Sequence, residues 1–292
     1  MRMVRTVHKE GRTHRRMWLA AFLLMLPGSP APAREPEGSV DAPTHRVDLA
    51  FVTLHFDYAE ELTPPMKSTE YGWLPGVRVA YTYWGDGVPI YGFISFDYAG
   101  GDLTYDGSIQ DGFGQVYPYL SSSPAGLSTL QARGGYIFKR IGGSGLDLAA
   151  YTGYGFHFWS RNIGGGPPTG YLEEYRWSCV PLGVAAGWWL GDRWSIGLTL
   201  EARFMVSGSI YVERSDFGKP TLTLGNEPGW MAALPIAVSQ SRNYALCVEF
   251  GYESSAIRES APSPPNQNGQ YILEPSSSTN QFWISMGGRF QL

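Results

Sequence analysis

Residues 175–207 read YRWSCVPLGVAAGWWLGDRWSIGLTLEARFMVS and contain two alternating segments joined by a short turn at residues 190–193. In residues 194–206 apolar side chains recur at every second position, and the positions between them include Glu201 and Arg203. Because side chains alternate between the two faces of a strand, this pattern indicates one apolar and one mostly polar face. The stretch therefore predicts a β-hairpin.

The length of the two segments separates a membrane hairpin from a water-soluble one. Each has roughly a dozen residues, which exceeds the usual ~5–6 of a soluble strand and suffices to cross a bilayer at a tilt. No apolar run reaches the ~20 residues that a membrane helix needs. We therefore interpret the stretch as a transmembrane β-hairpin, with a soluble secreted β protein as the alternative.

The first 33 residues have the composition of a signal peptide. Several Arg and Lys residues precede a short apolar run at residues 17–26, and Ala31-Pro32-Ala33 supplies small side chains for cleavage. We expect residues 34–45 to be a periplasmic tail and residues 46–292 to be the barrel. The full chain has a net charge of −4, and removal of the basic leader makes it more acidic, which argues against nucleic acid as a partner.

Eight further segments continue the pattern of the hairpin or vary it, and their spacing is regular. The predicted connections alternate between short turns and long segments, at about 59–73, 100–126, 159–174, 208–228 and 255–280. Short turns on one side and long loops on the other are typical of outer-membrane barrels, and soluble meanders have no reason to keep this order. The ten predicted strands are about 47–58, 74–84, 89–99, 127–139, 145–158, 175–189, 194–207, 229–239, 243–254 and 281–292.

The chain is thus predicted to be all-β, a ten-stranded antiparallel up-and-down transmembrane β-barrel. In the first strand we expect Ala50, Val52, Leu54, Phe56 and Tyr58 to face outward. Aromatic residues near the strand ends indicate two belts at the membrane interfaces. The principal belt residues are Trp84, Trp188, Trp194 and Phe290 at the short-turn ends and Trp177, Phe204 and Trp230 at the long-loop ends.

The last strand resembles the C-terminal strand of bacterial outer-membrane barrel proteins. Phe282, Ile284, Met286 and Phe290 keep the alternation, although Gly288 interrupts it and the final residue is Leu292 rather than Phe or Trp. The resemblance covers about residues 46–292. It implies a place in the outer membrane of a two-membrane bacterium, with assembly by the barrel-assembly machinery through the last strand.

Charged residues fall on the predicted lumenal face of several strands. An unpaired charge in a narrow lumen is costly, so opposite charges there should pair. Because ten strands enclose little more than side chains can fill, we favour a charge network that plugs the barrel. A narrow solute path is the alternative. The predicted network comprises Arg78, Asp97, Arg133, Glu201, Arg203, Glu249, Glu253 and Arg289, with Asp147 on the same face.

Strand number, short inner turns and long outer loops resemble the omptin family of outer-membrane proteases. The resemblance implies catalysis by an Asp pair and an Asp–His pair that activate water at the extracellular mouth. The residue pattern departs from this, since the loop after the seventh strand contains Asp216 and no histidine. The candidates for a divergent rim site are His55, Asp57 and His157, which could act as a base.

The sequence therefore favours a non-enzymatic barrel for envelope structure, surface interaction or limited solute passage, with an omptin-like hydrolase as the alternative. We find no spacing typical of a metal site and expect no cofactor. The expected partners are outer-membrane lipid and lipopolysaccharide, and the protein is expected to be a monomer.

Overall fold

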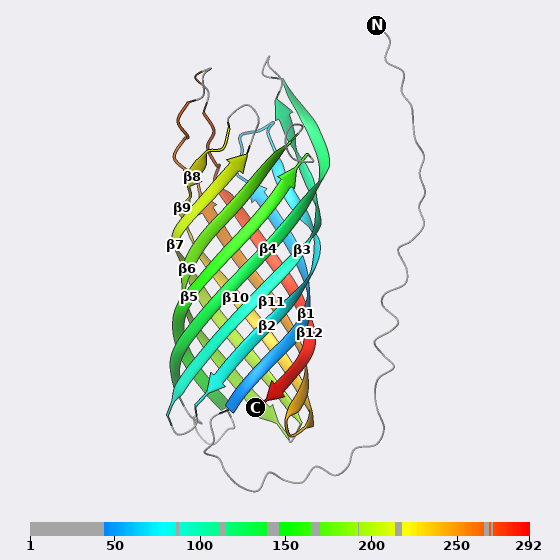
Figure 1. Ribbon diagram of the computed structural model, residues 1–292, viewed down its shortest axis with the longest axis vertical. Coiled ribbons are helices and arrows are strands. Elements are labelled where there is room, and N and C mark those ends of the chain that lie inside the picture. The colour runs from blue at the N-terminus through cyan, green and yellow to red at the C-terminus, as the bar shows by residue number, and fades with distance from the viewer. Residues whose placement is uncertain are drawn as a thin grey trace, which may run out of the picture. The chain divides into compact units, whose positions relative to one another are not determined.

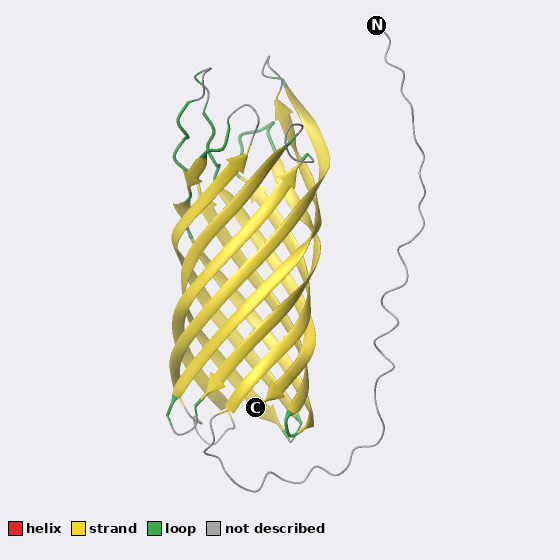
Figure 2. Cartoon of the chain, viewed as in Figure 1, coloured by secondary structure: helices red, strands yellow, loops and turns green. Residues whose placement is uncertain are grey.

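The computed structural model describes residues 44–85, 88–110, 115–138, 146–164, 170–191, 193–213, 218–265, 269 and 271–292. These residues form strands, turns and loops (Figure 2). No helix among them is long and apolar enough to cross a membrane. The segment predicted to be a signal peptide, and the predicted tail up to residue 43, lie outside the described residues.

Ten long strands form one closed antiparallel barrel (Figure 1). Each strand pairs with its neighbours in chain order, and pairing of β12 with β1 and of β10 with β7 completes the circle. This confirms the predicted fold class. The long strands are β1 (Thr44–Glu60), β2 (Ser68–Trp84), β3 (Ile90–Gln110), β4 (Val116–Phe138), β5 (Leu146–Ile163), β6 (Tyr171–Leu190), β7 (Trp194–Glu213), β10 (Pro228–Ser241), β11 (Tyr244–Arg258) and β12 (Ser277–Gln291). Two short strands, β8 (Thr221–Thr223) and β9 (Gly225–Asn226), lie between β7 and β10.

The hairpin of β6 and β7 forms where the sequence predicts it, and both strands are longer than expected. Leu190 pairs with Trp194 across a turn that begins at Gly191, whose φ of 67° is a conformation that glycine adopts without steric cost. An irregularity between Ser178 and Cys179 shifts the register once. The short connections of the barrel gather at this end, which we call the short-turn end, and we call the opposite end the long-loop end.

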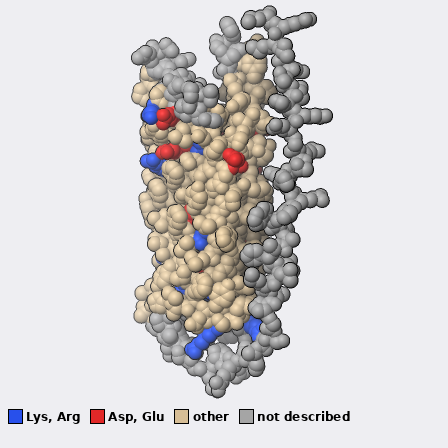
Figure 3. Space-filling model, turned by 45° about the vertical axis from the view of Figure 1, so that its right-hand side comes forward, with Lys and Arg blue, Asp and Glu red and all other residues tan. Residues whose placement is uncertain are grey.

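An apolar band covers the outer wall next to the short-turn end. On the face shown in Figure 3, charged side chains are sparse over the middle of the wall. Such a band lets strands face hydrocarbon while their backbone groups stay paired within the closed sheet. Exposed apolar residues of the band include Leu49, Phe51, Val77, Val79, Phe96, Leu130, Leu182, Val184, Leu200, Leu234, Leu246 and Met286.

The predicted orientation of β1 was wrong. Val52, Leu54, Phe56 and Tyr58 are buried in the lumen, and Ala50 lies on the same face of the strand, whereas Phe51 is 73% exposed on the outside. Phe56 and Tyr58 lie beyond the apolar band, where the lumen is packed, so these apolar residues belong inside. Ala50 and Val52 flank the band residue Phe51, and both faces of β1 are apolar there. The rule that apolar side chains point outward applies only within the band.

The strands also extend further toward the long-loop end than the sequence predicted. β3 continues to Gln110 and β4 begins at Val116, so most of the predicted loop 100–126 is paired strand. β1, β2, β5 and β6 likewise run into the predicted loops 59–73 and 159–174. Because of this extension, part of the barrel lies between the apolar band and the long-loop end. We call it the upper barrel, and we call the part within the band the lower barrel.

The lumen of this upper part is filled by a hydrophobic core. Tyr58, Tyr175 and Ile210 are fully buried, and Trp159 is nearly so. The ring of Trp159 stacks on Tyr175 with centroids 4.6 Å apart and contacts Phe56 and Tyr58 at 5.0 Å each. We call this group of side chains the plug. It occupies the lumen of the long-loop half.

Candidate functional site in the barrel lumen

Below the plug the lumen contains a chamber with a cavity volume of about 280 Å³. Its wall runs from Trp84 and Trp189 near the short-turn end to His157 and Trp177 beneath the plug. Ten of its residues carry a formal charge, five arginines and five carboxylates: Arg46, Arg78, Arg133, Arg203, Arg289, Asp48, Asp97, Asp147, Glu249 and Glu253. Most of these charges meet an opposite charge within the lumen.

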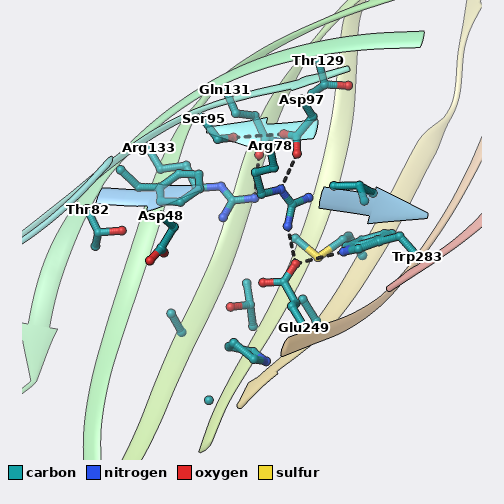
Figure 4. A pocket seen from close by; sticks show the side chains of 18 of the residues that line it. Asp48, Arg78, Thr82, Ser95, Asp97, Thr129, Gln131, Arg133, Glu249 and Trp283 are labelled. Atoms are coloured by element: carbon teal, nitrogen blue, oxygen red, sulfur yellow. Dashed lines mark hydrogen bonds and ion pairs between the residues drawn. The ribbon is translucent and has the colours of Figure 1, made fainter. Parts of the chain in front are cut away.

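Arg78 links opposite strands in the middle of the chamber. Its guanidinium donates to Asp97 on the neighbouring β3 and to Glu249 on β11 (Figure 4). The indole Nε1 of Trp283 donates to the same Glu249 carboxylate at 2.9 Å. Since β1 and β12 lie between β2 and β11, this chain of contacts ties together five consecutive strands.

A second group of ion pairs centres on Glu201, whose side chain is fully buried. It accepts from Arg133 at 2.8 Å, from Arg203 at 2.6 Å and from the hydroxyl of Tyr151 at 3.0 Å. Arg203 also binds Glu253 at 2.5 Å. Nearer the short-turn end, Arg289 binds Asp48 at 2.8 Å.

The structure thus brings the predicted lumenal charges together in three separate groups. All eight predicted network residues face the lumen, and each takes part in at least one ion pair. Asp147 lies on the chamber wall. Glu201 pairs with Arg203, and Arg133 is its second cation.

The three candidate catalytic residues are not brought together. His55 lies on the outer wall, where its ring meets Trp73 with centroids 4.8 Å apart, and Asp57 is exposed on the same face. His157 is buried inside, stacked on Trp177 and within hydrogen-bond distance of Thr129. The barrel wall therefore separates the first two from the third, and the expected lumenal placement of His55 and Asp57 was wrong.

The aromatic residues predicted for the belts divide between the two faces. Trp194, Phe204, Trp230 and Phe290 are exposed on the outside. Trp84, Trp177 and Trp188 contribute to the chamber wall instead. Trp177 is drawn inside because its ring stacks on His157, with an interplanar angle of 5°.

The plug contains a charged centre that sequence reasoning missed. Arg161 is 1% exposed, and its guanidinium binds Glu173 at 2.5 Å, Glu60 at 3.1 Å and Glu70 at 3.3 Å. It also lies over the rings of Tyr58, Trp159 and Tyr175, at 4.7, 4.9 and 5.3 Å from their centroids. A fourth carboxylate, Glu274, joins through the hydroxyls of Tyr58 and Tyr175, which donate to it at 2.9 and 2.8 Å. We call Arg161 and these four glutamates the Arg161 centre.

The four glutamates escaped prediction because all lie in segments expected to be loops. A usable signal was present for Arg161, since it continues the lumenal alternation of β5 from His157 and Trp159. The centre holds four carboxylates and one guanidinium. Burial, together with the nearby Glu173 and Glu60, raises the pKa of Glu274 to about 8. The Glu274 carboxyl therefore holds its proton at a higher pH than a carboxyl in water does.

Among the described residues, no group of three or more His, Cys, Asp or Glu is arranged to hold a metal ion. The Arg161 centre is consistent with this, because its carboxylates converge on a guanidinium.

Comparison with known proteins supports the fold and gives no family. No family model and no curated protein matches the chain. The outer membrane protease OmpT from Escherichia coli matches in structure with a TM-score of 0.61 and 11% identity, over 85% of this chain and 97% of that chain. A major outer membrane protein from Thermus thermophilus (TM-score 0.38, 12% identity, 84% and 99% of the two chains) and OprG from Pseudomonas aeruginosa (0.36, 7%, 86% and 97%) are more distant. The chain has the architecture of a ten-stranded bacterial outer-membrane barrel.

Close packing around Trp283 yields a first prediction. An alanine Cβ at Gly251 would stand 2.0 Å from the Trp283 ring, so Gly251→Ala must displace the indole that donates to Glu249. We expect a loss of about 1–3 kcal/mol in the free energy of unfolding, measured by urea titration of the folded protein in detergent. The control is Gly134→Ala on β4, where a Cβ meets nothing within 4 Å and the expected change is within ~0.5 kcal/mol. Equal stability of both variants would contradict a tightly packed network.

Proposed function

We propose that the protein is an integral outer-membrane barrel without enzymatic activity, whose lumen is closed and whose function resides on its extracellular surface. The apolar band and the closed sheet support a membrane location, because unpaired backbone groups and exposed charges are costly in hydrocarbon. In this proposal the short-turn end faces the periplasm and the long-loop end faces the outside.

The observation that carries the proposal is the plug. Phe56, Tyr58, Trp159 and Tyr175 fill the lumen beneath the long-loop end, between that end and the chamber. The Arg161 centre cross-links this packing to five segments, from β1, β2, β5, β6 and the β11–β12 loop. A solute path would have to break these contacts, so closure is the resting condition.

Liposome swelling tests closure with solutes. Purified protein folded into liposomes is expected to permit no uptake of small sugars or amino acids above protein-free liposomes, because the plug lies across the path. A known open porin in the same lipid serves as the positive control. Swelling that rises in proportion to the amount of folded protein would contradict closure and favour the narrow solute path.

The hydrolase alternative is supported by the fold alone. His55 and Asp57 lie across the wall from His157, so they form no acid–base cluster. The Arg161 centre lies at the level of the mouth but is buried, and a bound peptide bond could not reach it without moving the plug. Absence of peptide cleavage by the folded protein is expected, and turnover that His157→Ala abolishes would revive this alternative.

The proposed partners follow from the outer wall. We propose contact with membrane lipid along the apolar band and with lipopolysaccharide at its upper border, and recognition of β12 by the barrel-assembly machinery. The outward row of β12, with Phe282, Met286 and Phe290 exposed, is suited to such recognition.

A further inference from the structure

The connection between β11 and β12 lies at the long-loop end of the barrel (Figure 1). Its described legs, residues 259–265 and 271–276, are joined by paired contacts. Ser260 N donates to Glu274 O at 2.9 Å, and Glu274 N donates to Ser260 Oγ at 2.9 Å. Ser263 N donates to Ile272 O at 2.8 Å, and Ile272 N donates to Ser263 Oγ at 3.1 Å. The two legs therefore move as one unit, which we call the lid.

The lid is attached to the barrel by an apolar and a polar contact. Ile272 packs against the hydrophobic core of the plug. Glu274 is 4% exposed and its Oε1 accepts hydrogen bonds from Tyr58 on β1 and Tyr175 on β6. At the base of the lid, Glu61 N donates to Ser276 O at 2.7 Å. Glu274 is thus the one carboxylate of the Arg161 centre that comes from the lid rather than from a barrel strand.

The surroundings of Glu274 disfavour its charged form. Arg161 already binds Glu60, Glu70 and Glu173 directly. These three carboxylates offset its positive charge, so it stabilises a negative charge on Glu274 less. Glu259, the remaining acidic residue of the described legs, is exposed and remote from the plug. The titratable groups of the barrel that interact with Glu274 are Tyr58 and Glu60 of β1, Arg161 of β5, and Glu173 and Tyr175 of β6. Glu70 of β2 binds Arg161, and Tyr105 of β3 and Tyr171 of β6 interact with Glu60 and Arg161.

We propose that Glu274 makes this connection a pH-sensitive lid, which is docked on the plug while the carboxyl is protonated and is released when the carboxyl is charged. A neutral carboxyl can accept from the two tyrosines without adding to the surplus negative charge of the centre. A charged carboxylate adds a fourth negative charge beside a single guanidinium, and undocking returns it to water.

The direction of the pH effect follows from the pKa of Glu274. In water this carboxyl has an ordinary pKa of about 4.3, whereas burial raises the pKa of the docked group to about 8. The docked state therefore binds the proton more tightly. The free energy of docking is most favourable at acidic pH and becomes less favourable as the pH rises between these two pKa values. Above the higher pKa it does not change further.

Hydrogen–deuterium exchange of the full folded protein tests the lid. We expect the protection factors of the Ser260, Ser263, Ile272 and Glu274 amides to fall at least about tenfold between pH 5 and pH 8, since each pKa unit corresponds to a factor of ten. Protection factors are used because they remove the pH dependence of exchange chemistry. The amides of β4 at residues 127–131 serve as the internal control and should keep their protection.

Two variants separate the titration of Glu274 from general loosening. Glu274→Gln imitates the protonated carboxyl, so the protection factors of its lid amides should change by less than about threefold over the same pH range. Glu259→Gln, at an exposed site of the same lid, should show the pH dependence of the wild type. Tyr58→Phe removes one hydrogen bond to Glu274 without altering charge, and should shift release to lower pH. The proposal would be overturned if the protection of the lid amides did not change with pH in the wild type, or if it changed in Glu274→Gln as much as in the wild type. This proposal is tested separately from the proposed closure of the lumen. Hydrogen exchange of the lid amides can depend on pH whether or not the barrel conducts.

Discussion

Arg161→Met is expected to lower the free energy of unfolding by about 3–5 kcal/mol at pH 8, because it removes the cation and leaves four carboxylates, three of them buried. Glu60, Glu70 and Glu173 lose a direct ion pair, and the rings of Tyr58, Trp159 and Tyr175 lose the guanidinium that lies over them. Methionine retains much of the side-chain volume, so the loss reports charge more than packing. Thermal unfolding of the folded protein, followed by circular dichroism or by gel mobility, measures the effect.

The loss in Arg161→Met should shrink as the pH falls. Glu274 already has a raised pKa of about 8, so protonation of the centre can offset the missing cation at lower pH. The folded state of the variant takes up more protons than the unfolded state, and its stability therefore increases toward acidic pH.

The matched control for this variant is Arg176→Met on the outer face of β6. Its side chain is 56% exposed and pairs with Glu174 at 2.8 Å. An exposed pair contributes little, so the expected change is within about 1 kcal/mol. Equal effects of the two substitutions, or an Arg161→Met variant as stable as wild type, would contradict the role of the Arg161 centre.

Glu201→Leu is expected to destabilise the barrel by a comparable amount, about 3–5 kcal/mol, because it strands buried arginines. Arg203 keeps Glu253 at 2.5 Å, whereas Arg133 loses its carboxylate and keeps neutral partners such as Gln131, whose Oε1 accepts at 2.7 Å. The hydroxyl of Tyr151 also loses its acceptor. Urea titration at neutral pH measures the loss.

A double-mutant cycle identifies the stranded cation. Adding Arg133→Leu to Glu201→Leu removes the charge that has no carboxylate left, so the double variant should be more stable than Glu201→Leu alone. Additive losses in the cycle would mean that the two residues act independently, and unchanged stability of Glu201→Leu would contradict the lumenal network.

The sequence predicts the lower barrel well because one physical rule governs it. Within the apolar band the outer face is apolar, as the proposed membrane location requires, so the alternation from Trp194 to Val206 identifies both the strand and its lumenal residues. Glu201 and Arg203 could be placed inside for this reason, and the alternation of turns and loops identified the ten strands. The partners across the lumen, such as Glu249 for Arg78, depend on barrel closure and could not be read from local pattern.

The upper barrel was predicted poorly because the rule reverses there. Above the band water lies outside and the plug lies inside, so Phe56 and Tyr58 point inward and His55 and Asp57 point outward. Polar and glycine-rich stretches such as residues 100–110 and 116–126 resemble loops, yet they are paired strands. The Arg161 centre joins residues from five distant segments, and only the three-dimensional closure of the barrel brings them together.

Single-channel recording in a planar bilayer tests the closure of the lumen most directly. Purified folded protein, inserted at neutral pH, is expected to raise no discrete steps of ionic current under applied voltage, because the plug spans the lumen above the chamber. Insertion must be shown independently, for example by recovery of heat-modifiable protein from the same membrane preparation. Regular current steps of uniform size from inserted wild-type protein would contradict the plugged barrel.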